Sequence, residues 1–170
     1  SAHVGVAMGS GARIAKDAGD IILLDDNFKR IVDAIHEGRT IYANIKRMVT
    51  YLLATNLGEV LVSVGSLIIG MPIPLLPVQI LWVNLVTDTS MVIPLGLEPG
   101  EKRNMNRPPQ KPDAPLLSRF MISRIALIAI TMAAITLWQY VSFSNAHGEA
   151  YGRTIAFCSL VIMQWASALC

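Results

Sequence analysis

Residues 48–97 read MVTYLLATNLGEVLVSVGSLIIG followed by MPIPLLPVQILWVNLVTDTSMVIPLGL, and this stretch decides the fold. It contains two apolar runs joined by a Pro/Gly-rich turn. Its formally charged residues are Glu59 and Asp88, one near the middle of each run. A carboxylate near the centre of a membrane helix costs about 2.5–3.5 kcal/mol on insertion scales and by default marks a functional site. The stretch therefore predicts two membrane helices with a polar function.

Amide and hydroxyl side chains accompany each carboxylate. Asn56 precedes Glu59 by three residues, and Asn84 and Thr87 precede Asp88 by four residues and one residue. Residues three and four apart share one face of a helix. Two oxygen-rich patches at matching depth predict a site for a hard cation such as Ca²⁺, Mn²⁺, Mg²⁺ or Na⁺. The alternative is that both carboxylates only form hydrogen bonds between packed helices. A structural role of this kind is a good explanation for a single membrane carboxylate, but a poorer one for two carboxylates at matching depth.

The composition agrees with a membrane protein. The 170 residues are 53% hydrophobic and 15% charged, against about 25% charged in soluble domains, and the mean hydropathy is +0.50. A net charge of +2 gives no reason to expect nucleic acid as a partner. No catalytic or cofactor-binding motif is found, since the stretch GSGAR lacks the phosphate-loop pattern. Cys158 and Cys170 are expected to be buried free thiols.

The N-terminal part has the pattern of a soluble α/β segment. Residues 4–8 (VGVAM) and 20–24 (DIILL) are expected strands on either side of a short helix at 12–18, which predicts a parallel sheet edge. One such unit is too small to fold alone, so residues 1–25 are expected to complete a larger cytoplasmic domain. Residues 26–47 are predicted to form an amphipathic stalk helix, capped by Asp25 or Asp26, that continues unbroken into the membrane.

Residues 48–170 are predicted to form a transmembrane domain with spans at about 48–69, 75–97, 120–143 and 154–170. Pro94 is expected to kink or unwind the second span, and residues 144–153 are expected to be a loop. Basic residues gather at Lys46, Arg47 and the loop 98–119, whereas the turn after the first span has none. The positive-inside rule therefore predicts a multi-pass protein whose N-terminal part and 98–119 loop are cytoplasmic. The lipid bilayer is its expected partner.

Several ordered motifs carry a family resemblance. Residues 4–47 resemble the end of the phosphorylation domain and the stalk of P-type (E1–E2) cation-transporting ATPases of the calcium-pump-like branch. NLGEV (56–60) and LWVNLVTD (81–88) resemble that branch's fifth and sixth transmembrane helices, and MNRPPQKPDAPLLS (105–118) resembles the loop that follows. The resemblance implies a predominantly α-helical membrane protein with four transmembrane helices and a small N-terminal α/β remnant of a HAD-like phosphorylation domain.

The resemblance also implies roles for individual residues. The implied ligands of the transported ion are Asn56, Glu59, Asn84, Thr87, Asp88 and Gln164. Asp88 would be shared between two ion sites. Gln164 stands where the family has an acidic ligand in the eighth helix, and from its chemistry alone it serves equally well as a hydrogen-bonding contact between helices. The family's proline three residues after the sixth-helix aspartate is replaced by Met91.

An ATP-driven pump for cations, most of all Ca²⁺, is thus the expected function of the intact protein. ATP and Mg²⁺ would bind in parts of the pump expected upstream of Ser1, together with the phosphorylated aspartate, and two further spans are expected after Cys170. These residues alone are expected to be inactive as an ATPase. The alternatives are a Na⁺ or Mn²⁺ pump, a channel or carrier without ATPase activity, and a membrane scaffold that transports nothing.

Overall fold

The computed structural model describes residues 4–25, 27–100, 105, 108 and 115–169. The chain divides into two compact units, one made of residues 1–42 and 99–108 and the other of residues 43–98 and 109–170. Helix α2 (Lys29–Ile68) is continuous and contributes residues to both units. Each unit is described separately below.

The first unit contains a small parallel sheet. Strand β1 (Val6–Met8) pairs with β2 (Ile21–Leu23), with Val6 opposite Ile21, and the short helix α1 (Arg13–Asp17) connects them. The backbone N–H of Gly5 donates to Oδ2 of Asp20 at 2.8 Å and ties the two strand ends together. The predicted strand–helix–strand order and the parallel pairing are confirmed. Apolar side chains such as Ile14 (83% exposed) have no cover within this unit.

The start of α2 differs from the prediction. The side chain of Asn27 accepts a hydrogen bond from the backbone N–H of Lys29 at 3.0 Å, so Asn27 caps the helix. Asp25 instead forms an ion pair with Arg30 at 3.1 Å. The prediction that Asp25 caps α2 is wrong because Asn27 is closer to the free N–H groups of the first turn. Asp26 lies outside the described residues.

Helix α2 has 40 residues and runs without interruption from the predicted stalk into the first predicted span. Gly38 lies inside it, and a side chain at that position would contact nothing within 4 Å. The helix ends at Ile68, where Gly70 adopts a positive φ of 76° and the N–H of Met71 bonds the carbonyl of Ser66. This left-handed glycine termination satisfies late carbonyls of the helix.

The second predicted span forms as three consecutive helical segments, α3 (Pro77–Trp82), the π-helical turn η1 (Val83–Thr87) and α4 (Asp88–Gly96). Pro77 occupies the first turn of α3, where a missing N–H costs nothing. Pro94 is predicted from the sequence to kink or unwind the span. It does not unwind it, because α4 continues past Pro94 and the N–H of Leu97 bonds the carbonyls of Ile93 and Pro94, whereas a kink there stays a prediction. The departure from α geometry lies at η1 instead.

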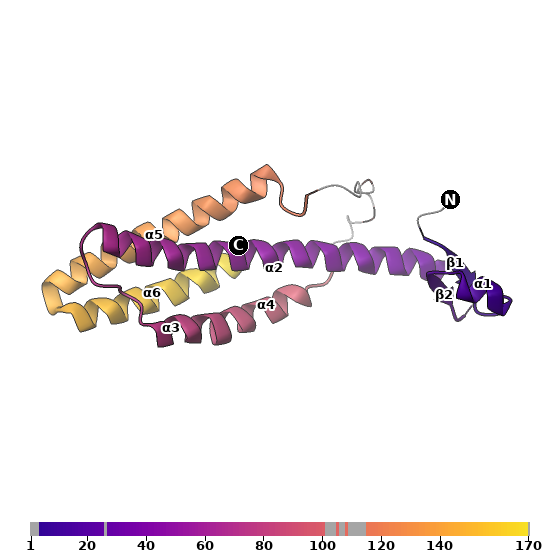
Figure 1. The fold of residues 1–170 in the computed structure, drawn as a ribbon, viewed down its shortest axis with the longest axis horizontal. Helices are drawn as coiled ribbons and strands as arrows, with labels where there is room; N and C mark the ends of the chain where they lie inside the picture. Colours follow the sequence, from indigo (N-terminus) through magenta and orange to yellow (C-terminus); the bar gives the residue numbers. More distant parts are fainter. Residues whose placement is uncertain (1–3, 26, 101–104, 106–107, 109–114, 170) are drawn as a thin grey trace. The chain divides into compact units, whose positions relative to one another are not determined.

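The last two helices, α5 (Arg119–His147) and α6 (Glu149–Leu169), form an antiparallel hairpin (Figure 1). Ser118 caps α5 by accepting from the N–H of Met121 at 3.3 Å. The predicted loop 144–153 is wrong, since Gly148 is the only residue between the two helices. Its φ of 94° allows a turn this tight, and an ion pair of Glu149 with Arg153 strengthens the first turn of α6.

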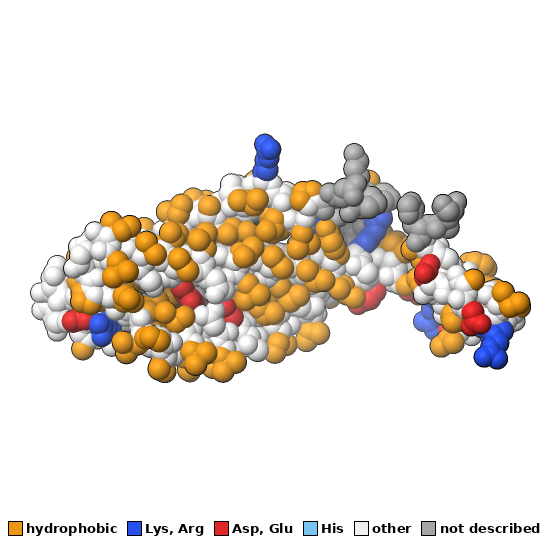
Figure 2. Space-filling view, viewed as in Figure 1, with side chains coloured by type: hydrophobic (Ala, Val, Ile, Leu, Met, Phe, Trp, Pro, Cys, Tyr) orange, Lys and Arg blue, Asp and Glu red, His pale blue; other side chains and the backbone are white. Residues whose placement is uncertain are grey.

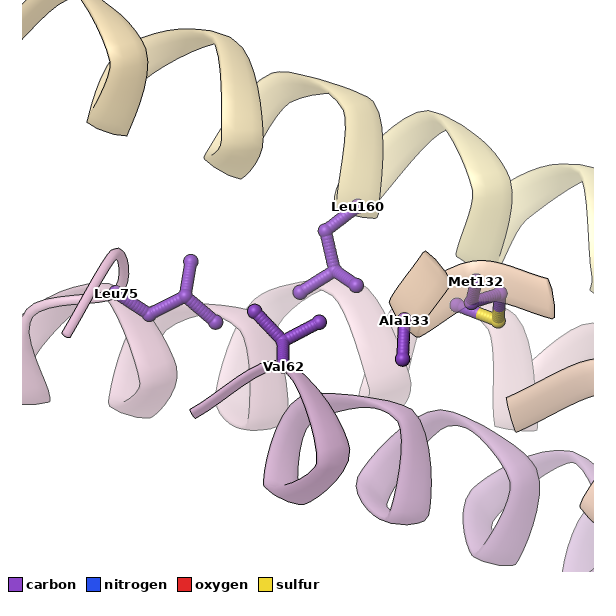
Figure 3. Close-up of a cluster of buried hydrophobic side chains, with 5 residues drawn as sticks. All are labelled: Val62, Leu75, Met132, Ala133 and Leu160. Atoms are coloured by element: carbon purple, nitrogen blue, oxygen red, sulfur yellow. The ribbon is translucent and has the colours of Figure 1, made fainter. Parts of the chain in front are cut away.

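A buried apolar cluster holds the helices of the second unit together. It consists of Val62, Leu75, Met132, Ala133 and Leu160, from α2, the turn before α3, α5 and α6 (Figure 3). Hydrophobic side chains also cover much of the visible outer face of these helices (Figure 2). A surface and a core that are both apolar are typical of helices that pack inside a lipid bilayer.

Three stretches of the described chain are long and apolar enough to cross a membrane, namely residues 29–68, 77–96 and 119–147. They overlap the first three predicted spans. Helix α6 is not among them, so the fourth span at 154–170 stays a prediction. Cys158 is a free thiol, as expected, but it is exposed on the outer face of α6 rather than buried. Cys170 lies outside the described residues.

Candidate cation site

Glu59 is the centre of a buried polar cluster in the second unit. Its carboxylate accepts hydrogen bonds from the side-chain amides of Gln164 at 2.8 Å and Asn84 at 3.2 Å. These amides come from α6 and η1, so one carboxylate on α2 joins three helical segments. Only 5% of Glu59 is exposed, and Gln164 is fully buried. Gln164, the least certain of the predicted ligands, is therefore in direct contact with Glu59.

Asp88 lies at the junction of η1 and α4 and is 4% exposed. Its Oδ2 accepts a hydrogen bond from the amide of Asn56 at 3.5 Å. The same amide also donates to the carbonyl of Leu52 on its own helix at 2.8 Å. Asp88 and Glu59 are close enough to act on each other electrostatically. Five predicted ligands are thus linked by hydrogen bonds in two groups around two carboxylates.

Three of the predicted ligands have a buried oxygen without a hydrogen-bond partner in the described structure. These atoms are Oγ1 of Thr87, Oδ1 of Asp88 and Oε1 of Gln164. A buried polar atom without a partner costs about 1–3 kcal/mol. Carboxylate, hydroxyl and amide oxygens are the ligands that hard cations prefer, so this donor set fits a cation such as Ca²⁺ or Na⁺.

The π-helical turn η1 determines how the second span presents its polar side chains. The backbone N–H of Asp88 bonds the carbonyl of Val83, five residues earlier, instead of that of Asn84. Such wide turns inside α-helices occur frequently at functional sites. Here the turn contains Asn84 and Thr87 and leads directly into Asp88. The backbone is therefore irregular where the predicted ligands of this span gather.

The charge of the cluster is uncompensated. In the described part of the chain, the hydrogen-bond partners of Glu59 and Asp88 are neutral amides, and neither carboxylate takes part in an ion pair. Two neighbouring carboxylates buried without a cationic partner are costly. A bound cation would offset this cost, whereas a purely structural cluster gains nothing from the second negative charge.

Sequence reasoning missed two polar side chains next to the cluster. The hydroxyl of Tyr51 lies near Asp88, and the Tyr51 side chain is buried. Thr55, also buried, donates to the carbonyl of Tyr51 at 3.1 Å. Tyr51, Thr55 and Glu59 follow one another at intervals of four residues on α2, so the helical spacing itself was the signal that would have found them.

Soft metal ligands do not contribute to the cluster. Among the residues that the structure describes, no group of three or more His, Cys, Asp or Glu side chains is placed to hold a metal ion. A site built from two carboxylates and neutral oxygens differs from a zinc or copper site, which uses imidazole and thiolate.

Comparison with known proteins gives one family. The family model described as "Cation transporting ATPase, C-terminus" matches residues 72–170. The "Calcium-transporting ATPase" of Bacillus subtilis (strain 168) is 43% identical over 168 residues, which are 96% of this chain and 19% of the relative. The "Probable cation-transporting ATPase F" of Mycobacterium tuberculosis (strain ATCC 25618 / H37Rv) is 39% identical over 165 residues, 96% of this chain and 18% of the relative. The chain thus spans about a fifth of the length of these relatives.

Proposed function

We propose that this chain, which belongs to the cation-transporting ATPase C-terminus family, supplies the ion-binding helices and the stalk of an ATP-driven cation pump. The main support is the buried cluster of Glu59, Asp88 and their neutral oxygen neighbours. The chemistry of ATP would take place in other parts of the intact pump, where ATP and Mg²⁺ bind. The chain's own residues would select the cation and hold it within the membrane.

Ca²⁺ is the cation that the cluster favours. Its two carboxylates balance the charge of one divalent ion, and Ca²⁺ takes six to eight oxygen ligands at about 2.3–2.6 Å. The six proposed ligands are Asn56, Glu59, Asn84, Thr87, Asp88 and Gln164. With glutamine instead of an acid at position 164, the cluster has the charge for a single divalent cation. A relative named for calcium transport points in the same direction.

Cation binding would reverse the orientation of the amides. Asn84 and Gln164 now direct their N–H groups at Glu59, where a cation would repel them. Rotation about the terminal side-chain bond would bring their carbonyl oxygens to the ion and free both oxygens of Glu59. In the absence of the ion, the same N–H groups stabilise the buried carboxylate. The amides thus serve both states of the site.

Helix α2 would couple the site to the ATP-driven domains. It carries Asn56 and Glu59 and is continuous with the stalk that leads to the α/β segment. A movement of the stalk caused by phosphorylation would displace two ligands relative to Asn84 and Gln164, so affinity for the cation would change. By linkage, cation binding would affect phosphorylation to the same extent. The α/β segment and residues 98–119 would face the cytoplasm.

Phosphorylation from ATP tests the ligand assignment in the intact pump. Glu59→Gln and Asp88→Asn keep the shape of each side chain but remove a charge, and each is expected to abolish cation-dependent phosphorylation. Glu149→Gln, the same change in the first turn of α6, is the matched control and is expected to behave as the unsubstituted pump. Normal cation-dependent phosphoenzyme in both Glu59→Gln and Asp88→Asn would refute the assignment.

The identity of the ion needs a separate measurement. ATPase activity of the intact pump would be measured with Ca²⁺, Mn²⁺ or Na⁺ added to cation-free buffer. Activation by micromolar Ca²⁺, on the order of sensor-type calcium affinities, is the expected result. If Mn²⁺ or Na⁺ activated the pump more strongly, that ion and not Ca²⁺ would be the transported cation, and the proposed site would still stand. No activation by any of them would refute the pump.

A further inference from the structure

A cavity lies in the second unit, apart from the amides and carboxylates that would hold the proposed ion. Its volume is about 350 Å³, within the range of about 300–1,000 Å³ typical of small-ligand sites. Its walls come from α2, the end of α4 and the residues after it, the first turns of α5 and the last turn of α6. Tyr51 is the one residue that it shares with the surroundings of Asp88.

The cavity is strongly basic for a site at a membrane helix bundle. Lys46 and Arg47 of α2 and Arg124 of α5 line it together with a single carboxylate, that of Glu98. Arg47 and Glu98 form an ion pair at 2.5 Å, and the described lining residues include three cations and one carboxylate. Basic pockets between transmembrane helices on the cytoplasmic side are a recurrent form of site for phosphorylated lipid headgroups.

Positive charge also comes from the backbone of α5. Phe120 and Met121, in the first turn of this 29-residue helix, line the cavity. The N-terminus of a helix has partial positive charge, which favours phosphate and other anions; here the N–H of Met121 is already bonded to Ser118, so the contribution comes from the helix dipole. The helix end adds to the three cationic side chains instead of opposing them.

The lining combines cations with an apolar part, as a phospholipid requires. On α2 the lining residues run from Lys46 and Arg47 to Ala54, whereas on α5 Arg124 lies between the apolar Phe120 and Met121 on one side and Ile128 on the other. Lys46 and Arg47 directly precede the first apolar run, so the cations lie at the level of the membrane–water interface and the apolar residues lie deeper. A free inorganic anion would make no favourable contact with the apolar end of the cavity.

We propose that this cavity binds the phosphodiester headgroup of an anionic phospholipid, with Lys46, Arg47 and Arg124 around the phosphate and the apolar end against the start of the acyl chains. Arg is suited to this role because its planar guanidinium donates two parallel hydrogen bonds to phosphate. The bound lipid would fix α2, the helix that carries Glu59, relative to α5 at the base of the stalk.

Lipid retention by the intact pump tests this site. The purified pump would be titrated in detergent with phosphatidylglycerol or phosphatidylcholine, and bound lipid would be counted by native mass spectrometry. One tightly held phosphatidylglycerol is expected, with phosphatidylcholine bound several-fold more weakly. Lys46→Gln and Arg124→Gln should each weaken phosphatidylglycerol binding about fivefold, and Arg124→Lys should largely retain it.

Arg119→Gln is the matched control, because Arg119 is an exposed cation five residues before Arg124 that does not line the cavity. It should bind phosphatidylglycerol as the unsubstituted pump does. Equal binding of the two lipids, or unchanged binding in both Lys46→Gln and Arg124→Gln, would overturn the proposal. Displacement of the lipid by excess inorganic phosphate would also overturn it, in favour of a site for free phosphate. Because the readout is bound lipid, the result is independent of which cation the pump transports.

Discussion

Gln164 of α6 donates its side-chain N–H to Oε1 of Glu59 on α2 across 2.8 Å, and both side chains are buried. The two residues are 105 positions apart in the sequence. A neutral amide here stabilises the carboxylate without neutralising its charge. Its own oxygen, Oε1, has no partner in the described structure and is available to a cation.

Replacement of Gln164 by glutamate should make the site depend more strongly on its cation. A third carboxylate beside Glu59 adds repulsion, so we expect Gln164→Glu to lower the thermal midpoint of the cation-free pump. With Ca²⁺ bound, the extra charge becomes a ligand. A tenfold gain in affinity would add about 1.4 kcal/mol of stabilisation at saturating Ca²⁺. Thermal unfolding with and without Ca²⁺ measures both effects.

The apolar variant Gln164→Leu is the counterpart to that experiment. It removes both the hydrogen-bond donor to Glu59 and the unpartnered amide oxygen. Ca²⁺ should therefore raise the thermal midpoint of this variant by less than it raises that of the unsubstituted pump. If Gln164→Glu and Gln164→Leu showed the same rise, Gln164 would be only a structural contact.

Two asparagines on the described helices should respond differently to the same substitution. Asn84 donates to Glu59, whereas Asn44 donates to the backbone carbonyls of Gly96 and Glu98 at 3.1 and 2.8 Å. Asn84→Ala should weaken the apparent cation affinity about tenfold, the loss of one ligand or charge-assisted hydrogen bond. Asn44→Ala should leave the affinity nearly unchanged and lower the thermal midpoint. Cation titrations of ATPase activity, paired with thermal unfolding, distinguish the two; a reversed pattern would contradict the assignment of Asn84.

Glycines in α2 and α6 should respond in opposite directions to alanine. A Cβ at Gly152 would lie 2.9 Å from the backbone nitrogen of Ser144 on α5, so Gly152→Ala should destabilise the hairpin by about 1–3 kcal/mol. A Cβ at Gly38 meets nothing within 4 Å, and Gly38→Ala should stabilise the stalk by about 0.5–1 kcal/mol. Thermal unfolding of the two variants checks both signs. Equal destabilisation by both would show that the close approach of α5 and α6 is not what requires glycine at 152.

The α/β segment should be protected only when its partners are present. Its sheet has two strands, and apolar side chains such as Ile14 and Leu24 are largely exposed within the unit. We expect amides of residues 4–24 to exchange rapidly in the 170-residue chain and slowly in the intact pump, because a two-stranded sheet is marginally stable alone. Hydrogen exchange followed by mass spectrometry makes the comparison. Slow exchange across residues 4–24 in the short chain would show that the segment folds independently.

The sequence was sufficient for features that depend on local pattern. Hydrophobic run lengths predicted the three stretches that are long and apolar enough to cross a membrane, and the alternation of short apolar runs predicted that the two strands pair in parallel. The helical spacing of Asn56 and Glu59, and of Asn84 and Asp88, predicted that these residues share helix faces, and the structure places all four in one polar cluster. Their role as ion ligands stays a prediction.

The sequence did not predict features for which two neighbouring residues or two local backbone conformations are nearly equally suitable. Asn27, and not Asp25, caps α2 because a shift of two residues along the chain decides which side chain reaches the free N–H groups. The tight turn at Gly148 replaces a loop because a glycine with positive φ lets both helices extend towards it. The wide turn at η1 could not be predicted from the hydrophobic pattern, because Val83, Leu85 and Val86 fit an α-helix as well as a π-helical turn.

That wide turn also gives the second span one residue more than an uninterrupted α-helix would need. A π-helical turn accommodates one residue more than an α-helical turn, so its displacement along the chain by one position would rotate the side chains it passes and leave the helix on either side intact. Val83 to Thr87 could then alter which oxygens face Glu59 while Pro77 and Gly96, at the two ends of the span, keep their places. The proposed ligands in η1 would then change register without any sliding of the whole helix along its axis.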